Sequence, residues 1–175
     1  METERLILRY AKLGDENEIY ELRNSEYVLK YNCMSKVTME QLREQVKKDM
    51  TSDHVFYMET IEDHRVIGII DLHEDSLRYG VNSLCFSYYL AQEYASKGYM
   101  SEALREMLRY CFKERKTEVV SVRVFKENMA SRRLVEKLGF INEGCIRRCV
   151  KGYQGILYDD LIYSILKEEY ECSKE

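Results

Sequence analysis

A loop of small residues at positions 95–100 is the first stretch whose residue types suggest chemistry. It separates an aromatic, strand-like run at 84–90 from an amphipathic segment at 101–113 whose apolar residues recur at helical spacing. The first N–H groups of a helix have no acceptor inside the helix, so such a junction attracts anions. The junction therefore predicts a cradle for a pyrophosphate. A purely structural connection, with Ser101 as the helix cap, is the alternative interpretation.

A second polar cluster begins a later helix, which we predict at about 128–138. Asn128 is a preferred N-cap residue, and Gly139 is placed to end the helix in the left-handed conformation. Asn128 and Ser131 are three residues apart, so they share one face of the first turn. We expect both side chains to reach a polar ligand.

The hydrophobic periodicity predicts the elements that would position these residues. A first helix follows Gly14, with Ile19 and Leu22 facing inward. A capping box beginning at Thr38 predicts a second helix, and residues 23–37 between the two read as a loop. The inward residues expected in the second helix are Leu42, Val46 and Met50.

Strands are expected wherever the period changes from 3.6 to 2 residues. These runs are residues 5–10, 54–60, 66–72, 84–90, 119–125, 141–150 and 156–166. Together with the helices they predict an α/β fold in a single domain, 1–175. Its centre would be a mixed, mostly antiparallel sheet of about six to seven strands flanked by helices on both faces.

Composition and charge narrow the class of protein. The chain has 175 residues and a net charge of −4, and no window approaches the roughly 18 apolar residues of a membrane span. It opens without the pattern of a signal peptide, so we expect a cytoplasmic protein without membrane contact. The six cysteines show no C-x-x-C pair, which argues against a metal site. Nucleic-acid binding is disfavoured, and its only candidate residues are Lys126, Arg132, Arg133 and Lys137.

The motifs resemble the GNAT superfamily of N-acetyltransferases, and within it the Rim-type branch, which includes acetyltransferases of ribosomal-protein amino termini. The resemblance lies in residues 88–108 (YYLAQEYASKGYMSEALREML), 127–144 (ENMASRRLVEKLGFINEG) and 158–170 (YDDLIYSILKEEY). These segments occur in the family's order, and the resemblance extends over nearly the whole chain. It implies the acyl-CoA N-acyltransferase fold, with acetyl-CoA as the acetyl donor.

The resemblance also assigns roles to individual positions. The family's acetyl-CoA loop falls on residues 95–100, so the backbone amides there would hold the pyrophosphate. The end of the preceding strand would pair through its backbone with the pantetheine arm, as in strand addition. The implied cofactor-binding residues are Tyr89, Leu90, Ser96, Lys97, Gly98, Tyr99, Met100, Ser101, Asn128, Ser131 and Arg132.

Three positions depart from the family pattern. Ala95 replaces the usual Gln or Arg of the loop, and Met100 replaces a small residue. Val135 stands where many members have a Tyr that protonates the departing thiolate. In the Rim-type branch a Ser at the position of Ser131 resembles a replacement for that acid.

Acetyl transfer to an amine also needs a neutral nitrogen. An α-amino group has a pKa of about 7.7 to 8.0 and a lysine about 10.4, so a terminal amine needs less help from a base. Glu59 and Asp71 are the candidate bases, and Asp71 is preferred because it ends an apolar strand. The predicted catalytic residues are therefore Ser131, Asn128 and Asp71. The predicted substrate contacts are Tyr88 and Asp159, with Tyr163 as a further candidate.

The sequence thus predicts an acetyl-CoA-dependent N-acetyltransferase that acts by direct transfer, without a metal. The acceptor is a primary amine on a small molecule or peptide: a protein N-terminal amine, a polyamine or another small amine. A homodimer is left open. The alternative is an acetyl-CoA-binding sensor or interaction module with little or no turnover.

Overall fold

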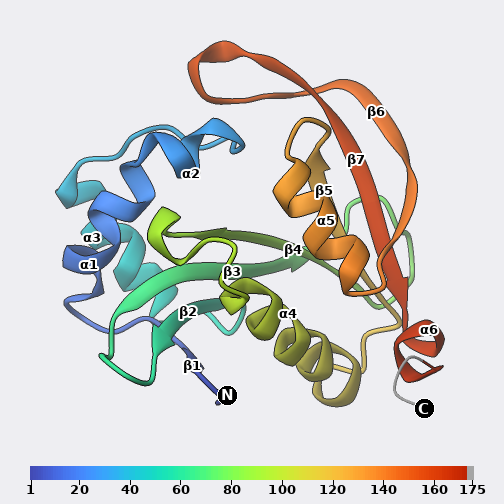
Figure 1. Ribbon diagram of the computed structural model, residues 1–175, viewed down its shortest axis with the longest axis horizontal. Coiled ribbons are helices and arrows are strands. Elements are labelled where there is room, and N and C mark those ends of the chain that lie inside the picture. The colour runs from blue at the N-terminus through green and yellow to red at the C-terminus, as the bar shows by residue number, and fades with distance from the viewer. Residues whose placement is uncertain (173–175) are drawn as a thin grey trace. The chain divides into compact units, whose positions relative to one another are not determined.

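One sheet organises the part of the chain that the computed structural model describes, residues 1–172 (Figure 1). Within this range seven strands are hydrogen-bonded in the order β1-β2-β3-β4-β5-β7-β6. The pairs β1–β2, β2–β3, β5–β7 and β6–β7 are antiparallel, and β4–β5 is parallel. The predicted mixed, mostly antiparallel sheet is confirmed. Its strands are β1 (Leu6–Arg9), β2 (Val55–Thr60), β3 (Val66–Glu74), β4 (Ser83–Leu90), β5 (Val119–Phe125), β6 (Ile141–Lys151) and β7 (Leu157–Leu166).

The helices follow the predicted order with three corrections. The six helices of residues 1–172 are α1 (Asp15–Asn24), α2 (Glu26–Lys30), α3 (Met39–Asp49), α4 (Tyr99–Arg109), α5 (Met129–Lys137) and α6 (Lys167–Cys172). The expected loop at 23–37 contains α2, which Ser25 caps by accepting a hydrogen bond from Val28 N. Met50 is 39% exposed rather than inward, because α3 ends at Asp49. Helix α4 begins two residues earlier than predicted and continues into a π-helical turn at Tyr110–Glu114.

Two compact units divide the chain. The first comprises Met1–Asp71, Tyr88–Ala103 and Gly152–Gln154, and the second comprises Leu72–Ser87, Leu104–Lys151 and the chain from Gly155 onward. Elements β3, β4 and α4 each contribute residues to both units. The loop predicted to hold an anion therefore belongs to the first unit, and the Asn128 cluster to the second.

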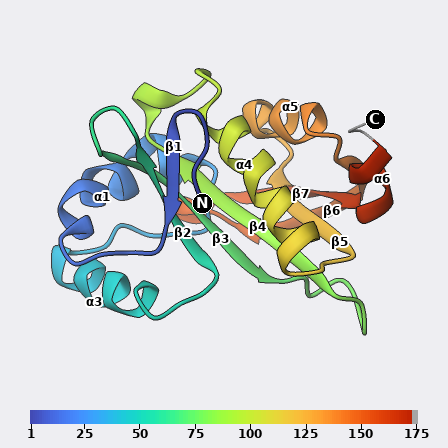
Figure 2. The same ribbon diagram turned by 90° about the horizontal axis from the view of Figure 1, so that it is seen from below.

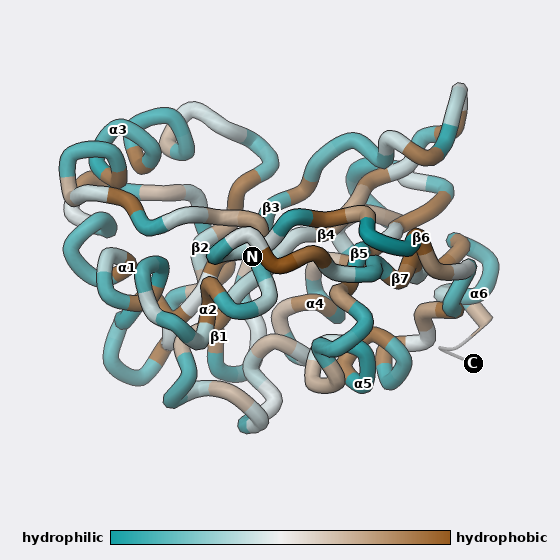
Figure 3. Tube along the Cα trace, turned by 90° about the horizontal axis from the view of Figure 1, so that it is seen from above, coloured by the Kyte–Doolittle hydropathy of each residue, from teal (hydrophilic) through white to brown (hydrophobic). Residues whose placement is uncertain are grey.

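The first unit is built by packing α1 and α3 on strands β2 and β3. Ile19 of α1, Leu42 and Val46 of α3 and Tyr57 of β2 are almost completely buried in one cluster. Figure 2 shows the two helices lying beside this part of the sheet, and in Figure 3 both are largely hydrophilic with hydrophobic interruptions. Burial of one apolar face per helix therefore positions α1 and α3. The predicted capping box at Thr38 is present.

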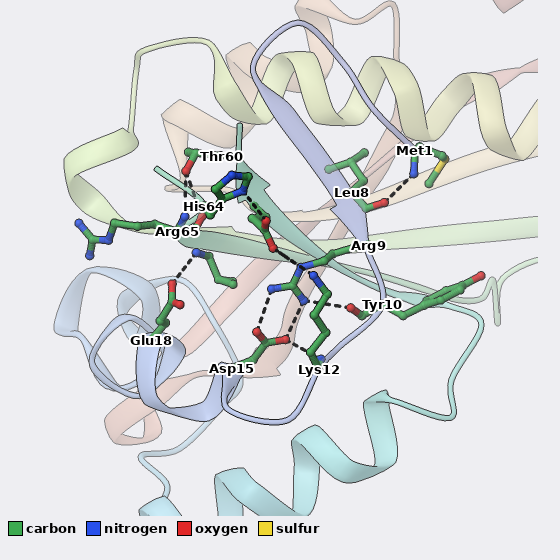
Figure 4. A network of polar contacts seen from close by, with 12 residues as sticks. Met1, Leu8, Arg9, Tyr10, Lys12, Asp15, Glu18, Thr60, His64 and Arg65 are labelled. Carbon is green, nitrogen blue, oxygen red and sulfur yellow. Dashed lines mark hydrogen bonds and ion pairs between the residues drawn. The ribbon is translucent and has the colours of Figure 1, made fainter. Parts of the chain in front are cut away.

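A buried ion-pair network ties β1 to the start of α1 (Figure 4). The Arg9 guanidinium donates to both carboxylate oxygens of Asp15 at 2.8 Å and also binds the carboxylate of Glu59. His64 Nδ1 lies 3.0 Å from the other oxygen of Glu59. Only 7% to 12% of these three charged side chains, those of Arg9, Asp15 and Glu59, is exposed. The network therefore fixes the first strand by charge-assisted hydrogen bonds rather than by apolar packing alone.

The second unit is an antiparallel ladder with a helix on it. Strand β7 pairs with β5 from Val119–Leu166 to Phe125–Asp160, and with β6 on its other side. Helix α5 buries Val135 completely, and Gly139 ends the helix at φ +91°, as predicted. Asn128 is the N-cap of α5, also as predicted.

Replacing Glu59 tests the buried network. Burial raises the pKa of Glu59, but hydrogen bonds from Arg9 and His64 outweigh this and lower it overall. Its stabilisation is therefore present above the unfolded pKa of about 4.3 and is lost as the pH falls through the lower folded pKa. Glu59→Gln should reduce the free energy of unfolding in urea at pH 7 by about 3 kcal/mol, and by less at acid pH, because Arg9 loses a buried partner.

The matched control is Glu44→Gln, which breaks an exposed ion pair with Lys47. Its cost should be much smaller, because water and salt screen an exposed ion pair. Equal losses in the two variants would show that the Arg9 network contributes no more than a surface ion pair.

Candidate functional site

The loop before α4 has the backbone of an anion site. Ser96 and Gly98 both adopt left-handed conformations, with φ of +59° and +88°. Glu102 N donates to Gly98 O at 3.0 Å, and this bond starts the helical pattern, so the amides just before it lie in the first turn. First-turn amides have no intrahelical acceptor and carry the positive end of the helix dipole. The predicted cradle therefore has the required local geometry.

Two side chains of the first turn refine this prediction. Ser101 lies inside the turn and does not cap it, which corrects the alternative interpretation. Its Oγ is buried and has no hydrogen-bond partner among the described residues, so a hydroxyl donor lies beside the unpaired amides. Met100 is 7% exposed. Its bulk is therefore packed inside the protein.

Arg5 of the first unit holds the loop and the first turn of α4 together. Its Nη1 donates to Lys97 O at 3.1 Å, and its Nε donates to Glu102 Oε2 at 2.7 Å. Glu102 Oε1 also accepts from Arg5 N at 2.8 Å and from Thr3 Oγ1 at 2.6 Å. The guanidinium lies over the Tyr99 ring at 4.3 Å. This clamp was not foreseen from sequence, because nothing local to residues 3–5 points to a partner about a hundred residues away.

The end of β4 offers backbone groups in the same unit. The parallel pairing with β5 covers Ser83–Phe86, and β4 continues past it to Leu90. Gly68 of β3 allows the approach of this segment, since a Cβ there would lie 2.6 Å from Tyr89 O. The Tyr89 side chain packs against the core clusters of the first unit, and burial raises the pKa of its phenol. The Tyr89 side chain is thus largely engaged in the core, and its backbone is the part that continues the strand edge.

The start of α5 brings Asn128 and Ser131 together. Asn128 Oδ1 accepts from Ser131 N at 3.2 Å, so this oxygen serves as the helix cap. Arg132 Nη1 donates to Lys126 O at 3.4 Å, which anchors the third predicted cofactor residue of this helix. The geometry brings the predicted pair together through a cap, which a purely structural role would also explain.

Burial argues against a catalytic or substrate-binding role at two positions, Val135 and Tyr163. Val135 is completely buried, so the position of the family's usual acid faces the core in this chain. Tyr163 is 1% exposed, and its hydroxyl donates to Glu136 Oε1 at 2.7 Å. Tyr163 is therefore a core residue of β7, which argues against the predicted substrate contact.

The two candidate bases have different surroundings. Glu59 is committed to Arg9, and its lowered pKa makes it a weak base. Asp71 has 43% of its side chain exposed, and its Oδ1 lies 3.0 Å from His54 Nδ1. Asp71 is thus the accessible carboxylate of the two, as the sequence favoured.

Asp49 is a third carboxylate that the sequence did not indicate. It is 6% exposed at the end of α3, where its oxygens accept from Gln45 Nε2 at 2.7 Å and from Tyr57 OH at 2.8 Å. Burial raises the pKa of Asp49 despite these hydrogen bonds. The contact with Tyr57 creates this environment. Because that contact is tertiary, the spacing of residues in the sequence does not predict it.

Asp159, which is predicted to contact substrate, binds residues of the second unit. Its Oδ1 accepts from Arg148 N at 3.0 Å, and Lys126 Nζ lies 3.5 Å from its Oδ2. The hydrogen bond from Arg148 N lowers the pKa of Asp159, and Lys126 adds to the effect. Asp159 therefore stays ionised and supports strand β6.

Residues 1–172 contain no group of three or more His, Cys, Asp or Glu residues placed to hold a metal ion. None of the helices in this range is long and apolar enough to cross a membrane.

Comparison with known proteins identifies the family. Residues 5–141 match the family described as the Acetyltransferase (GNAT) domain. The chain belongs to the GNAT acetyltransferase family. It is 31% identical to the SPbeta prophage-derived uncharacterized N-acetyltransferase YokL of Bacillus subtilis, over 75% of this chain and 73% of that protein. The predicted enzyme class is therefore confirmed.

Solved structures agree with this assignment. A GNAT-family acetyltransferase from Bacillus anthracis superposes with a TM-score of 0.86 at 29% identity, covering 96% of this chain and 98% of the other. The spermidine N-acetyltransferase of Vibrio cholerae, solved with CoA and spermine, has a TM-score of 0.81 at 25% identity, covering 95% and 98%. The GNAT fold is thus shared along almost the full length of the chain.

Removing the Arg5 clamp should weaken CoA binding. Arg5→Lys keeps the charge but loses the fork that joins Lys97 O to Glu102, so the loop must be ordered at each binding event. We expect the Kd for CoA to rise about tenfold by calorimetry. Glu106→Gln, which breaks the local pair with Arg109 in the same helix, should leave it unchanged. A Kd for Arg5→Lys within twofold of wild type would show that the clamp does not shape the loop.

Proposed function

We propose that this acetyltransferase transfers the acetyl group of acetyl-CoA directly to a primary amine. The first turn of α4 carries the proposal for the cofactor. Left-handed Ser96 and Gly98, the first-turn amides and the unpartnered Ser101 Oγ together suit an anion with several acceptor oxygens. A pyrophosphate fits this donor set, and Lys97 adds a positive charge.

The other cofactor contacts follow the family resemblance and the local geometry of each unit. The backbone of Tyr89 and Leu90 would pair with the pantetheine arm, since β4 extends past its pairing with β5. In the second unit, Asn128 and Ser131 would contact the arm nearer the thiol, and Arg132 would help to neutralise the phosphates. When bound, acetyl-CoA supplies the thioester that the amine attacks.

Proton transfer falls to two side chains in this proposal. Asp71, which is accessible and beside His54, accepts the proton of the amine, directly or through water. Ser131 Oγ donates a proton to the leaving sulfur and takes one back from water, because Val135 at the usual acid position has no acidic proton. Tyr88, at the end of β4, would contact the acceptor.

Burial argues against a covalent cysteine mechanism at the two enclosed thiols. Cys111 is completely buried, and burial raises the pKa of its thiol to about 12. Burial also raises the pKa of Cys85. Since the thiolate is the nucleophile, neither suits covalent catalysis.

The acceptor class rests on the nitrogen chemistry. The spermidine N-acetyltransferase among the structural relatives supports an amine acceptor, and the Rim-type resemblance supports a peptide amino terminus. An α-amino group is partly neutral near pH 8. We propose a peptide N-terminal amine as the acceptor, with polyamines and other small amines as the competing substrates.

We propose that residues 1–175 form one acetyltransferase domain that works in the cytoplasm. The six unpaired cysteines, four of them exposed, suit a reducing compartment. A homodimer remains compatible with this arrangement.

The direct test is CoA release with a panel of amines: peptide amino termini, polyamines, aminoglycosides and amino acids. Gly98→Val should abolish most of the activity and raise the Kd for CoA at least tenfold, because a side chain at φ +88° distorts the cradle. Gly80→Val is the control, since Gly80 is also left-handed, at φ +70°, and has open space around it. Tight CoA binding without turnover on any amine would favour the sensor over the enzyme. Unchanged CoA affinity in Gly98→Val would remove the loop from the site.

Asp71 has its own test. Asp71→Asn should lower kcat about a hundredfold at pH 7 and by less at pH 9, because a larger share of the amine is then neutral without a base. The loss should be smaller for an α-amine than for a lysine side chain. Glu62→Gln, in the exposed turn after β2, serves as the control. A larger loss in Asp49→Asn than in Asp71→Asn would transfer the role of base to Asp49.

A further inference from the structure

Strand β6 carries a bulge that places three residues opposite one. Ile146 pairs with Asp160 and Val150 pairs with Tyr158, so Arg147, Arg148 and Cys149 all face the single residue Asp159. Arg148 has a left-handed backbone, with φ +49°. A non-glycine residue in this conformation costs free energy, and such bulges redirect side chains near functional sites.

Two carboxylates beneath the bulge hold its shape. Asp159 Oδ1 accepts from Arg148 N at 3.0 Å, which satisfies the amide that the bulge removes from the ladder. Asp160, 1% exposed, accepts from Arg123 Nε at 2.7 Å, and Arg123 Nη2 lies 2.8 Å from Cys149 Sγ. These contacts hold two of the three bulge residues, Arg148 and Cys149, in place.

The bulge leaves the guanidinium groups of Arg147 and Arg148 exposed. Arg147 and Arg148 are exposed, and within residues 1–172 neither guanidinium forms a hydrogen bond or an ion pair. The positive charges of Lys126 and Arg147 both act on the carboxylate of Asp159. Both side chains line a cavity of about 760 Å³, together with Cys145, Ile146 and Asp159. The local charge is thus positive, on a chain whose net charge is −4.

We infer that the β6 bulge binds an anionic group of the acceptor through Arg147 and Arg148. The forks of two guanidinium groups match carboxylate geometry. The acceptor would then be an amine that also bears carboxylates, such as a peptide with an acidic amino-terminal sequence, rather than a polyamine. This inference rests on the proposed amine acetylation and narrows its substrate class. The supporting elements, β6 and β7, are seen side by side in Figure 1.

The test compares two peptides of equal length, Ala-Glu-Asp-Phe and Ala-Gln-Asn-Phe, with spermidine as a third acceptor. In wild type, kcat/KM should be about tenfold higher for the acidic peptide than for the neutral one, and this preference should shrink with added salt. In Arg147→Gln/Arg148→Gln the preference should disappear through a higher KM for the acidic peptide. Arg147→Gln alone, at an ordinary backbone position, should lose part of it. Lys151→Gln removes a positive charge from the same strand outside the cavity lining and should keep it.

Several results would overturn the inference. One is faster turnover of spermidine than of the acidic peptide, and another is an equal loss for both peptides in the double variant. A rise in KM for acetyl-CoA instead of the peptide would assign the two arginines to a cofactor phosphate. If wild type acetylates no amine, the proposed function fails, and calorimetry with the acidic peptide still tests the cavity. Wild-type binding that is lost in the double variant would support the anion site, and absence of binding would refute it.

Discussion

The amides at the start of α4 are the constraint on which the first unit depends. A helix begins with N–H groups that its own backbone cannot satisfy, and here two left-handed residues turn the preceding loop around them. Holding the loop in this one conformation costs free energy. Arg5 and Thr3 meet the cost by binding Lys97 O and Glu102, so contacts within the first unit hold the loop against the first turn of α4.

The same physical device recurs in the molecule: a charged side chain from one segment satisfies the backbone or the charge of another. Arg9 joins β1 to Asp15 and Glu59, and Asp159 takes the amide that the β6 bulge leaves unpaired. In each case the acidic residue has a structural partner. Glu59, one of the two candidate bases, is therefore committed to the fold, and Asp71 remains the accessible one.

Local sequence signals predicted most of the fold. The capping box at Thr38, the N-cap Asn128 and the stop at Gly139 are all present because each is decided by a few neighbouring residues. The misses occur where the local signal is weak. Helix α2 was missed in a stretch of polar and aromatic residues, and the start of α4 depends on the loop backbone rather than on the Ser101 side chain.

The prediction of the site likewise depended on how much of each feature is encoded in neighbouring residues. Motifs predicted the loop and the Asn128 cluster as parts of the site. The Arg5 clamp and the environment of Asp49 arise from tertiary contacts that no spacing reveals. Tyr163 was misjudged for the same reason, since only the packed structure shows its bond to Glu136.

The central claim is that the amides of residues 96–101 bind the pyrophosphate of acetyl-CoA. Amide proton and nitrogen chemical shifts test it most directly, in a titration of the labelled protein with CoA and, separately, with pantetheine, which lacks the pyrophosphate. The account predicts large shifts of Gly98, Tyr99 and Ser101 with CoA and small ones with pantetheine. Unchanged amides with CoA, or equal shifts with both ligands, would contradict it.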